Sequence, residues 1–221
     1  MIAFTANFAW ELYLVTESDL SPGRSTIEVV KRAIEGGVKV IQMREKFMDV
    51  RERYQLGKQL RRITAENDVC LIINDRVDLA LALNADGVHL GQEDFPWEEA
   101  REILGENSII GASVSEPEQL DRLNEEVVDY IGFGSVFTTQ SKRLESENQA
   151  VGIENLKRTA KMTALPILGI GGINNDNVKE VIKAGAEGAA VISALTQAEN
   201  IAETAERMIT KIKEAKNDKQ R

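Results

Sequence analysis

The sequence predicts a parallel α/β barrel of the (β/α)₈ (TIM) class, because short apolar segments alternate with amphipathic helical segments along the chain. Eight segments of each kind can be counted, and no Pro/Gly-rich linker divides them. The strand candidates are rich in Val and Ile, as expected for strands covered on both faces. A chain of 221 residues with 43% apolar residues can form one such domain over residues 1–221.

The strand candidates are short and each is followed by a helical candidate. The strands are expected at residues 11–16, 38–44, 69–75, 87–91, 108–114, 128–136, 166–172 and 188–194. The helices are expected at residues 25–37, 49–67, 76–85, 96–105, 117–126, 152–162, 176–186 and 199–216. Ser25, Pro96 and Pro117 are suited to helix starts. The last residues, about 217–221, are interpreted as a frayed tail.

A doubly wound open sheet is the alternative fold. Such a sheet usually has fewer strands, and it carries a glycine-rich turn after the first strand. The corresponding stretch here, "TESDLSPG" at residues 16–23, holds a single glycine. The barrel is therefore favoured, and its active site is expected where the strands end, at their C-terminal sides.

Composition excludes several classes of function. The net charge of −9 argues against nucleic acid or an acidic membrane surface as a partner. One histidine and one cysteine cannot form a zinc site or an internal disulfide. His89 lies in mid-strand and is interpreted as a hydrogen-bonded structural residue, and Cys70 in an apolar run favours the cytoplasm. No signal peptide or membrane span is recognised, and a homo-oligomer stays open.

The segment "VIQMREK" at residues 40–46 begins as an apolar strand and ends in polar side chains. Because successive side chains of a strand point to opposite faces, Gln42, Arg44 and Lys46 are expected on one side. They would form a row of donors suited to a diphosphate. The alternative is a solvated strand end at which Arg44 pairs with Glu45.

Two aspartates end neighbouring strand candidates. Asp75 and Asp94 are expected to lie close together, and two carboxylates without histidine suit Mg²⁺, which completes its shell with phosphate oxygens and water. Arg44, Lys46 and Lys142 are expected on the same rim. The charge of Mg²⁺ offsets that of the two aspartates, so the formal charge of the rim with its ion is about +3, which suits a diphosphate ester. The alternative is that Asp75 caps the following helix and pairs with Arg76.

Glycines mark the seventh strand candidate. Gly169, Gly171 and Gly172 allow a ligand to approach the backbone, and the loops after the last two strands form the usual phosphate site of this fold. Amides near Gly172, Ile192 and Ser193 would donate to phosphate oxygens. The alternative is that these glycines only permit tight turns.

With these residues in place, the sequence resembles the thiamine phosphate synthase family over nearly the whole chain, from "LYLVT" to "VISAL". The matching motifs are "QMREK", "INDRVDLALALNADGVHLGQED", "GAS", "DYIGFGSVF" followed by "TTQSK", "GIGGI" and "VIS". The resemblance implies a transferase that condenses 4-amino-2-methyl-5-(diphosphooxymethyl)pyrimidine with a thiazole phosphate. The products would be thiamine phosphate and diphosphate, formed by Mg²⁺-assisted dissociative loss of diphosphate.

The resemblance also assigns roles to residues. The implied metal ligands are Asp75 and Asp94, and the implied catalytic residues are Arg44, Lys46, Ser113 and Lys142. The implied substrate-binding residues are Gln42, Met43, Arg44, Glu45, Lys46, Asn74, Ser113, Thr139, Gln140, Ser141, Lys142, Gly172, Ile192 and Ser193. Of these, Thr139 and Ser141, with backbone around Gly172, Ile192 and Ser193, would hold the thiazole phosphate.

The sequence departs from the family in one loop. The family usually has proline at the position of Thr138 and threonine at that of Ser141, and the acidic stretch 143–150 replaces smaller residues. These differences bear on loop closure and turnover rate. The competing functions are a related thiazole tautomerase, in which the aspartate pattern is lost and a histidine follows the "GxS" strand, and a non-catalytic phosphate-ligand sensor. Here Val114 and Ser115 stand at the histidine position.

Overall fold

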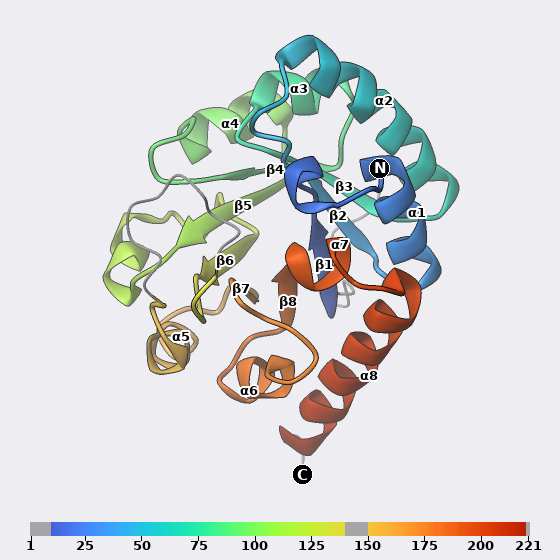
Figure 1. Cartoon of the computed structure of the whole chain (residues 1–221). Coiled ribbons are helices and arrows are strands. Elements are labelled where there is room, and N and C mark those ends of the chain that lie inside the picture. Colours follow the sequence, from blue (N-terminus) through green and yellow to red (C-terminus); the bar gives the residue numbers. More distant parts are fainter. Residues whose placement is uncertain (1–9, 140–149, 220–221) are drawn as a thin grey trace.

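The computed structural model describes residues 10–139 and 150–219 (Figure 1). Its eight strands form a closed barrel in chain order, and each neighbouring pair is parallel. The predicted TIM barrel is therefore confirmed. The strands are β1 (Leu12–Val15), β2 (Val40–Met43), β3 (Cys70–Asn74), β4 (Gly87–Leu90), β5 (Ile109–Val114), β6 (Tyr130–Gly134), β7 (Ile167–Ile170) and β8 (Gly188–Val191).

Helices surround the barrel (Figure 1). They are α1 (Thr26–Glu35), α2 (Val50–Glu66), α3 (Val77–Ala82), α4 (Trp97–Leu104), α5 (Ile153–Thr159), α6 (Val178–Lys183), α7 (Ser193–Thr196) and α8 (Ile201–Lys219), with 3₁₀ helices η1 (Ser18–Leu20) and η2 (Pro117–Arg122). In the described part of the chain, none of them combines the length and apolar character that crossing a bilayer requires.

Several sequence-based boundaries differ from the structure, and three of these differences have an identifiable physical reason. The helix expected at 117–126 is the shorter η2, because the acidic residues at 125 and 126 are unfavourable at a helix C-terminus. The strand expected at 188–194 ends at Val191, since Ile192 leaves the extended conformation and its carbonyl accepts the first hydrogen bonds of α7. Residues 217–219 belong to α8, whose basic last turn complements the helix dipole.

Side chains alternate between two apolar layers. One layer fills the space between barrel and helices, and the other fills the barrel lumen. The lumen is occupied by Trp10, Tyr13, Val15, Val40, Cys70, Ile72, Ile109, Tyr130, Leu168 and Ala190. Two tyrosines in this layer place hydroxyl groups inside the barrel, where they need hydrogen-bond partners.

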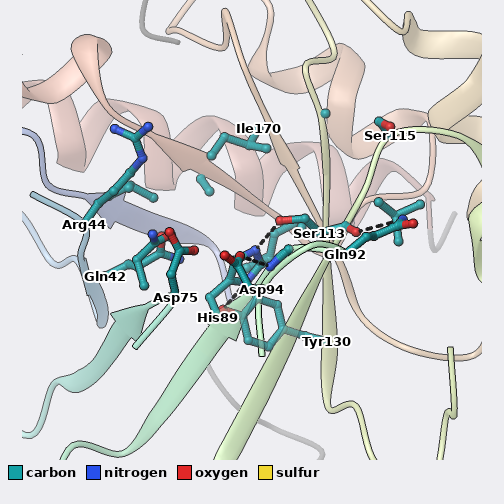
Figure 2. Close-up of a pocket in the computed structure, with 18 of the residues that line it drawn as sticks. Gln42, Arg44, Asp75, His89, Gln92, Asp94, Ser113, Ser115, Tyr130 and Ile170 are labelled. Carbon is teal, nitrogen blue, oxygen red and sulfur yellow. Dashed lines mark hydrogen bonds between the residues drawn. The ribbon is translucent and has the colours of Figure 1, made fainter. Parts of the chain in front are cut away.

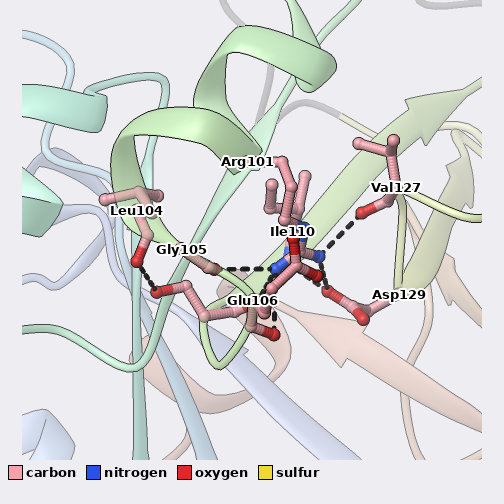
Figure 3. Close-up of polar contacts among 8 residues, drawn as sticks. Arg101, Leu104, Gly105, Glu106, Ile110, Val127 and Asp129 are labelled. Carbon is pink, nitrogen blue, oxygen red and sulfur yellow. Dashed lines mark hydrogen bonds and ion pairs between the residues drawn. The ribbon is translucent and has the colours of Figure 1, made fainter.

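Arginine–aspartate pairs fasten the N-terminal end of the barrel. Asp129 directly precedes β6, and its Oδ2 accepts hydrogen bonds from Arg101 Nη2 on α4 and from the backbone nitrogen of Ile110 on β5, each at 2.7 Å (Figure 3). Asp86, directly before β4, repeats this arrangement with Arg61 on α2 and Leu71 on β3. Each pair ties a helix to two strands at the end of the barrel where the strands begin.

Asp129→Ala is expected to destabilise the protein without altering the residues at the C-terminal ends of the strands. The substitution leaves the partly buried Arg101 guanidinium and the Ile110 amide without their carboxylate, which costs about 2 kcal/mol or more. The midpoint of urea denaturation measures the loss. Glu118→Ala, which removes an exposed pair with Arg158, should leave the midpoint essentially unchanged. Equal midpoints for Asp129→Ala and the wild type would contradict the structural role of the pair.

Candidate active site

A cavity of about 560 Å³ lies at the C-terminal end of the barrel (Figure 2). Most of its polar lining residues come from β2 to β5 and from the loops that follow them, as the barrel rule predicts. A smaller cavity of about 30 Å³ adjoins it and shares Ile170, Ala190 and Ile192 with it. Two adjacent hollows on one face can accept two ligands, or one ligand with two anionic ends.

The row of donors after β2 is present in the structure. Gln42, Arg44 and Lys46 line the large cavity, although the strand itself ends at Met43 rather than at residue 44. The side chain of Met43 is buried in the layer between barrel and helices. That of Glu45 is also buried, and it accepts hydrogen bonds from the Ser18 backbone and the Thr26 hydroxyl, both at 2.9 Å.

The assignment of Met43 and Glu45 as substrate-binding residues stays a prediction, and the positions of their side chains do not support it. Neither lines the cavity, and both side chains have structural partners on the helical side. Glu45 adopts a φ of 41°, which turns the chain after the strand and lets its carboxylate reach back to the start of α1. The two residues shape the row of donors without contributing side chains to it.

Arg44 pairs with Glu17, a residue that the sequence did not single out. Nη1 of Arg44 donates to Oε2 of Glu17, and only 3% of the Glu17 side chain is exposed. Burial raises the pKa of Glu17, while the Arg44 charge opposes this shift. The expected alternative, a pair between Arg44 and Glu45, is not formed. The only sequence signal for Glu17 is an acidic residue directly after the first strand, "LVTE".

Asp75 and Asp94 meet in the large cavity, although 19 residues separate them in sequence. Burial raises the pKa of the Asp75 carboxyl, and a hydrogen bond with Asp94 raises it further, while Lys46 opposes both effects at 3.4 Å. The Asp94 carboxylate also accepts a hydrogen bond from the Gly91 backbone at 2.6 Å. Figure 2 shows the two aspartates near the centre of the polar lining.

The alternative role of Asp75 as a helix cap is not borne out. The residue preceding α3 is Arg76, no side chain caps this helix, and Arg76 pairs with Asp78 instead. Asp75 itself has a φ of 62°, a left-handed conformation that an aspartate tolerates better than most side chains. The backbone thus turns the carboxylate toward the cavity.

The carboxylate pair fits a hard divalent cation shared with a ligand. The described residues contain no group of three or more metal-ligating side chains, so a cation here would need further oxygens from a bound phosphate or from water. Among the described lining residues, three cationic side chains (Arg44, Lys46, Arg122) face three carboxylates (Asp75, Glu93, Asp94). Their formal charges cancel, so binding of a diphosphate here would gain from added positive charge.

Hydrogen-bonded polar side chains cross the floor of the cavity. His89 Nδ1 lies 2.9 Å from the Tyr130 hydroxyl, and His89 Nε2 lies 3.0 Å from Ser113 Oγ. The interpretation of His89 as a hydrogen-bonded structural residue is supported, and the histidine also lines the cavity. Burial raises the pKa of Tyr13 and of Tyr130, so both hydroxyls keep their protons. Asn74 completes this part of the lining.

The small cavity lies where the phosphate site was expected. Thr139, Gly172, Ile192 and Ser193 all line it. Gly172 has a φ of 64°, and a Cβ there would come within 2.6 Å of the Thr138 carbonyl, so this position requires glycine for its turn as well as for close approach. Three predicted binding residues, Gln140, Ser141 and Lys142, lie outside the described residues, as does most of the acidic stretch 143–150.

Comparison with known proteins identifies the family. A family model described as thiamine monophosphate synthase matches residues 12–195. The chain belongs to the thiamine monophosphate synthase family. A thiamine-phosphate synthase of Haloarcula marismortui is 46% identical over 208 residues, which is 94% of this chain and 99% of that protein. A thiamine-phosphate synthase of Pyrococcus furiosus is 44% identical over 198 residues, covering 90% of this chain and 92% of that protein.

One solved structure agrees with this family membership, and a second shares the fold. A thiamine phosphate pyrophosphorylase from Pyrococcus furiosus superposes with a TM-score of 0.83 at 42% identity, covering 94% of this chain and 97% of that one. A thiamine phosphate pyrophosphorylase from Bacteroides thetaiotaomicron superposes with a TM-score of 0.64 at 16% identity and shows a shared fold only.

Proposed function

We propose that the chain is a thiamine-phosphate synthase that joins the pyrimidine diphosphate to a thiazole phosphate and releases diphosphate. The observation that carries the proposal is the convergence of Arg44, Lys46, Asp75 and Asp94 in one cavity, beside a second, glycine-lined cavity. The family relatives bear this activity in their names. We also propose a single barrel domain over residues 1–221 and a cytoplasmic location, with no nucleic acid partner.

The large cavity would hold the pyrimidine diphosphate. Arg44 and Lys46, joined by Lys142, would donate to the diphosphate oxygens, and Gln42, Asn74 and Ser113 would complete the polar contacts. The carbon–oxygen bond to diphosphate would break first, with its electron pair leaving on the diphosphate. The cationic donors stabilise that developing negative charge, which is the main contribution of the site to the rate.

The small cavity would hold the phosphate of the thiazole partner. Thr139 and Ser141, with backbone near Gly172, Ile192 and Ser193, would fix that phosphate. The thiazole nitrogen then forms its bond to the pyrimidine methylene carbon by donating its lone pair. Because this nitrogen carries no proton, the reaction requires no base, in agreement with a site whose one histidine is held by hydrogen bonds. Alignment of the two partners supplies the rest of the catalysis.

Asp75 and Asp94 would hold Mg²⁺ between them and the diphosphate. Bound there, the ion would neutralise charge on the leaving group. The cancelling lining charges support this proposal, because the cavity offers a diphosphate no net attraction from its described side chains alone. The raised pKa of Asp75 supports it also, since two carboxylates in contact favour a cation or a proton between them.

The two aspartates and Ser115 also argue against the tautomerase alternative. Both aspartates face the cavity, and the position after the β5 strand is occupied by Ser115, which lines the cavity. A sensor without catalysis would need neither carboxylate. We therefore keep synthase activity as the proposed function.

The deciding experiment is an assay with the purified chain, both substrates and Mg²⁺, in which thiamine phosphate and free diphosphate are quantified. Equal amounts of the two products are expected, with no product when either substrate or Mg²⁺ is omitted. Isomerisation of the thiazole phosphate without diphosphate release would point to the tautomerase. Binding of either phosphate compound without turnover would point to the sensor.

A further inference from the structure

A continuous row of hydrogen bonds crosses the barrel lumen beneath the large cavity. Gln42 Nε2 donates to the Tyr13 hydroxyl at 2.8 Å, and the Tyr13 and Tyr130 hydroxyls lie 2.9 Å apart. Tyr130 contacts His89 Nδ1 at 2.9 Å, and His89 Nε2 contacts Ser113 Oγ at 3.0 Å. Figure 2 shows the last part of this row, from Tyr130 through His89 to Ser113. We refer to these five residues as the relay.

The first hydrogen bond sets the direction of the others. A tyrosine hydroxyl has one proton to donate. Within the described part of the chain, Gln42 and Tyr130 are the hydrogen-bond partners of the Tyr13 hydroxyl. Because Tyr13 accepts from Gln42, its own proton goes to Tyr130. The Tyr130 proton then goes to His89 Nδ1, which must be the unprotonated nitrogen of the ring.

The same logic fixes Ser113. A neutral imidazole carries one proton, so unprotonated Nδ1 implies a proton on Nε2. Nε2 then donates to Ser113 Oγ, and the serine proton is left to point elsewhere. Ser113 lines the large cavity, so its hydroxyl becomes a donor to a ligand there. The opposite direction would make Ser113 donate to His89 and offer the cavity only lone pairs.

Packing holds the relay in place. Tyr13 and Tyr130 are each 1% exposed, so surrounding side chains fix both rings in position. Gly111 and Gly132 leave space for the rings of Tyr130 and His89. A Cβ at Gly111 would lie 2.2 Å from the Tyr130 ring and 2.5 Å from His89 Nδ1. A Cβ at Gly132 would lie 2.8 Å from the imidazole. Neighbouring strands are therefore built around this arrangement.

We propose that Gln42, acting through Tyr13 and Tyr130, holds His89 as the Nε2–H tautomer and thereby makes Ser113 a hydrogen-bond donor to an oxygen of the pyrimidine diphosphate. Tyr13, Tyr130 and His89 are then positioning residues. The tautomer follows from the relay alone, whereas the role of Ser113 rests on the proposed function.

The tautomer can be measured directly, because the chain contains a single histidine. Nitrogen-15 chemical shifts of the labelled imidazole distinguish a protonated from an unprotonated ring nitrogen. At a pH where the ring is neutral, the wild type should show unprotonated Nδ1 and protonated Nε2. Tyr130→Phe removes the donor to Nδ1 and should give a mixture of tautomers. A wild-type spectrum with protonated Nδ1 would overturn the proposal without any substitution.

Gln42→Glu provides the sharper test. A carboxylate can only accept from the Tyr13 hydroxyl, so each later hydrogen bond should reverse and His89 should become the Nδ1–H tautomer. Adding Tyr13→Phe should abolish this reversal. Gln119→Glu is the matched control, since Gln119 also lines the cavity but its Oε1 accepts from the Ser115 backbone at 2.7 Å, outside the relay. An unchanged tautomer in folded Gln42→Glu protein, at a pH high enough to ionise the new carboxyl, would contradict the relay.

Activity separates the role of Ser113 from the relay. Tyr130→Phe should lower kcat several-fold with little change in the KM of the thiazole phosphate, and Ser113→Ala should lower it by about tenfold. In the Ser113→Ala background, Tyr130→Phe should have no further effect, because the two act through one hydrogen bond. If the losses in kcat from Tyr130→Phe and Ser113→Ala were additive, Tyr130 would not act through Ser113. An inactive wild type would instead count against the proposed function and leave the tautomer result standing.

Discussion

Replacing Asp75 by asparagine is expected to reduce thiamine phosphate formation by about 10²–10³-fold and to raise the melting temperature of the protein free of divalent cations. The loss follows if Asp75 holds Mg²⁺ against the diphosphate, since asparagine brings no negative charge. The fold should persist, because asparagine matches aspartate in shape and tolerates the φ of 62° at this position. Steady-state kinetics and thermal denaturation measure the two effects.

The gain in stability follows from the direction of the pKa shift. Burial and the hydrogen bond with Asp94 raise the pKa of Asp75 above its ordinary value of 3.8, so the folded state favours the neutral carboxyl. The stability contributed by this group is complete below that ordinary value and is lost as the pH rises through the raised pKa. Asparagine stays neutral and avoids the loss, so its advantage over the wild type should shrink as the pH falls toward 3.8.

Ligand addition reverses the comparison. Mg²⁺ with diphosphate should raise the melting temperature of the wild type by mass action and should have little effect on Asp75→Asn. Asp78→Asn is the matched control, because Asp78 lies nearby in sequence but is exposed and pairs with Arg76 away from the cavity. It should retain wild-type turnover. Wild-type turnover in Asp75→Asn, or in the native enzyme with a chelator, would exclude the metal role.

The alternation of strands and helices was sufficient to predict the barrel and the face that carries the site. Period-two alternation also predicted that Gln42, Arg44 and Lys46 share a side, although the strand stops at Met43. The chain turns after it, at Glu45 with its φ of 41° and at residues 46–47, yet Arg44 and Lys46 still line the cavity together with Gln42. Asp75 and Asp94 were likewise predicted together, because adjacent parallel strands end at the same rim.

The contacts between side chains could not be predicted from local pattern. Glu17 faces Arg44, and Tyr13 faces Tyr130 across 117 positions of sequence, so only the closed barrel brings them together. Met43 and Glu45 fell within a motif that the resemblance assigned to the substrate, and a motif does not distinguish residues that touch a ligand from residues that hold the loop. Burial and hydrogen bonds make that distinction.

Arg44→Ala is expected to lower kcat/KM for the pyrimidine diphosphate by about 10²–10³-fold while changing the KM of the thiazole phosphate little. Arg44 lines the large cavity and not the small one, so its charge acts on the diphosphate. Kinetics with each substrate varied in turn measure the difference. Comparable losses for both substrates would contradict the division of the site into two cavities.

The buried partner of Arg44 must be controlled in this experiment. Arg44→Ala leaves the Glu17 carboxylate buried without its cation, which destabilises the fold and could lower activity indirectly. Combining Arg44→Ala with Glu17→Gln removes that charge, and the stability lost in the single variant should largely return. If the low kcat/KM persists in the stable double variant, the loss belongs to the missing guanidinium. Recovery of activity together with stability would instead assign Arg44 a structural role. Of the row Gln42, Arg44 and Lys46, only Lys46 would then supply a positive charge to the diphosphate.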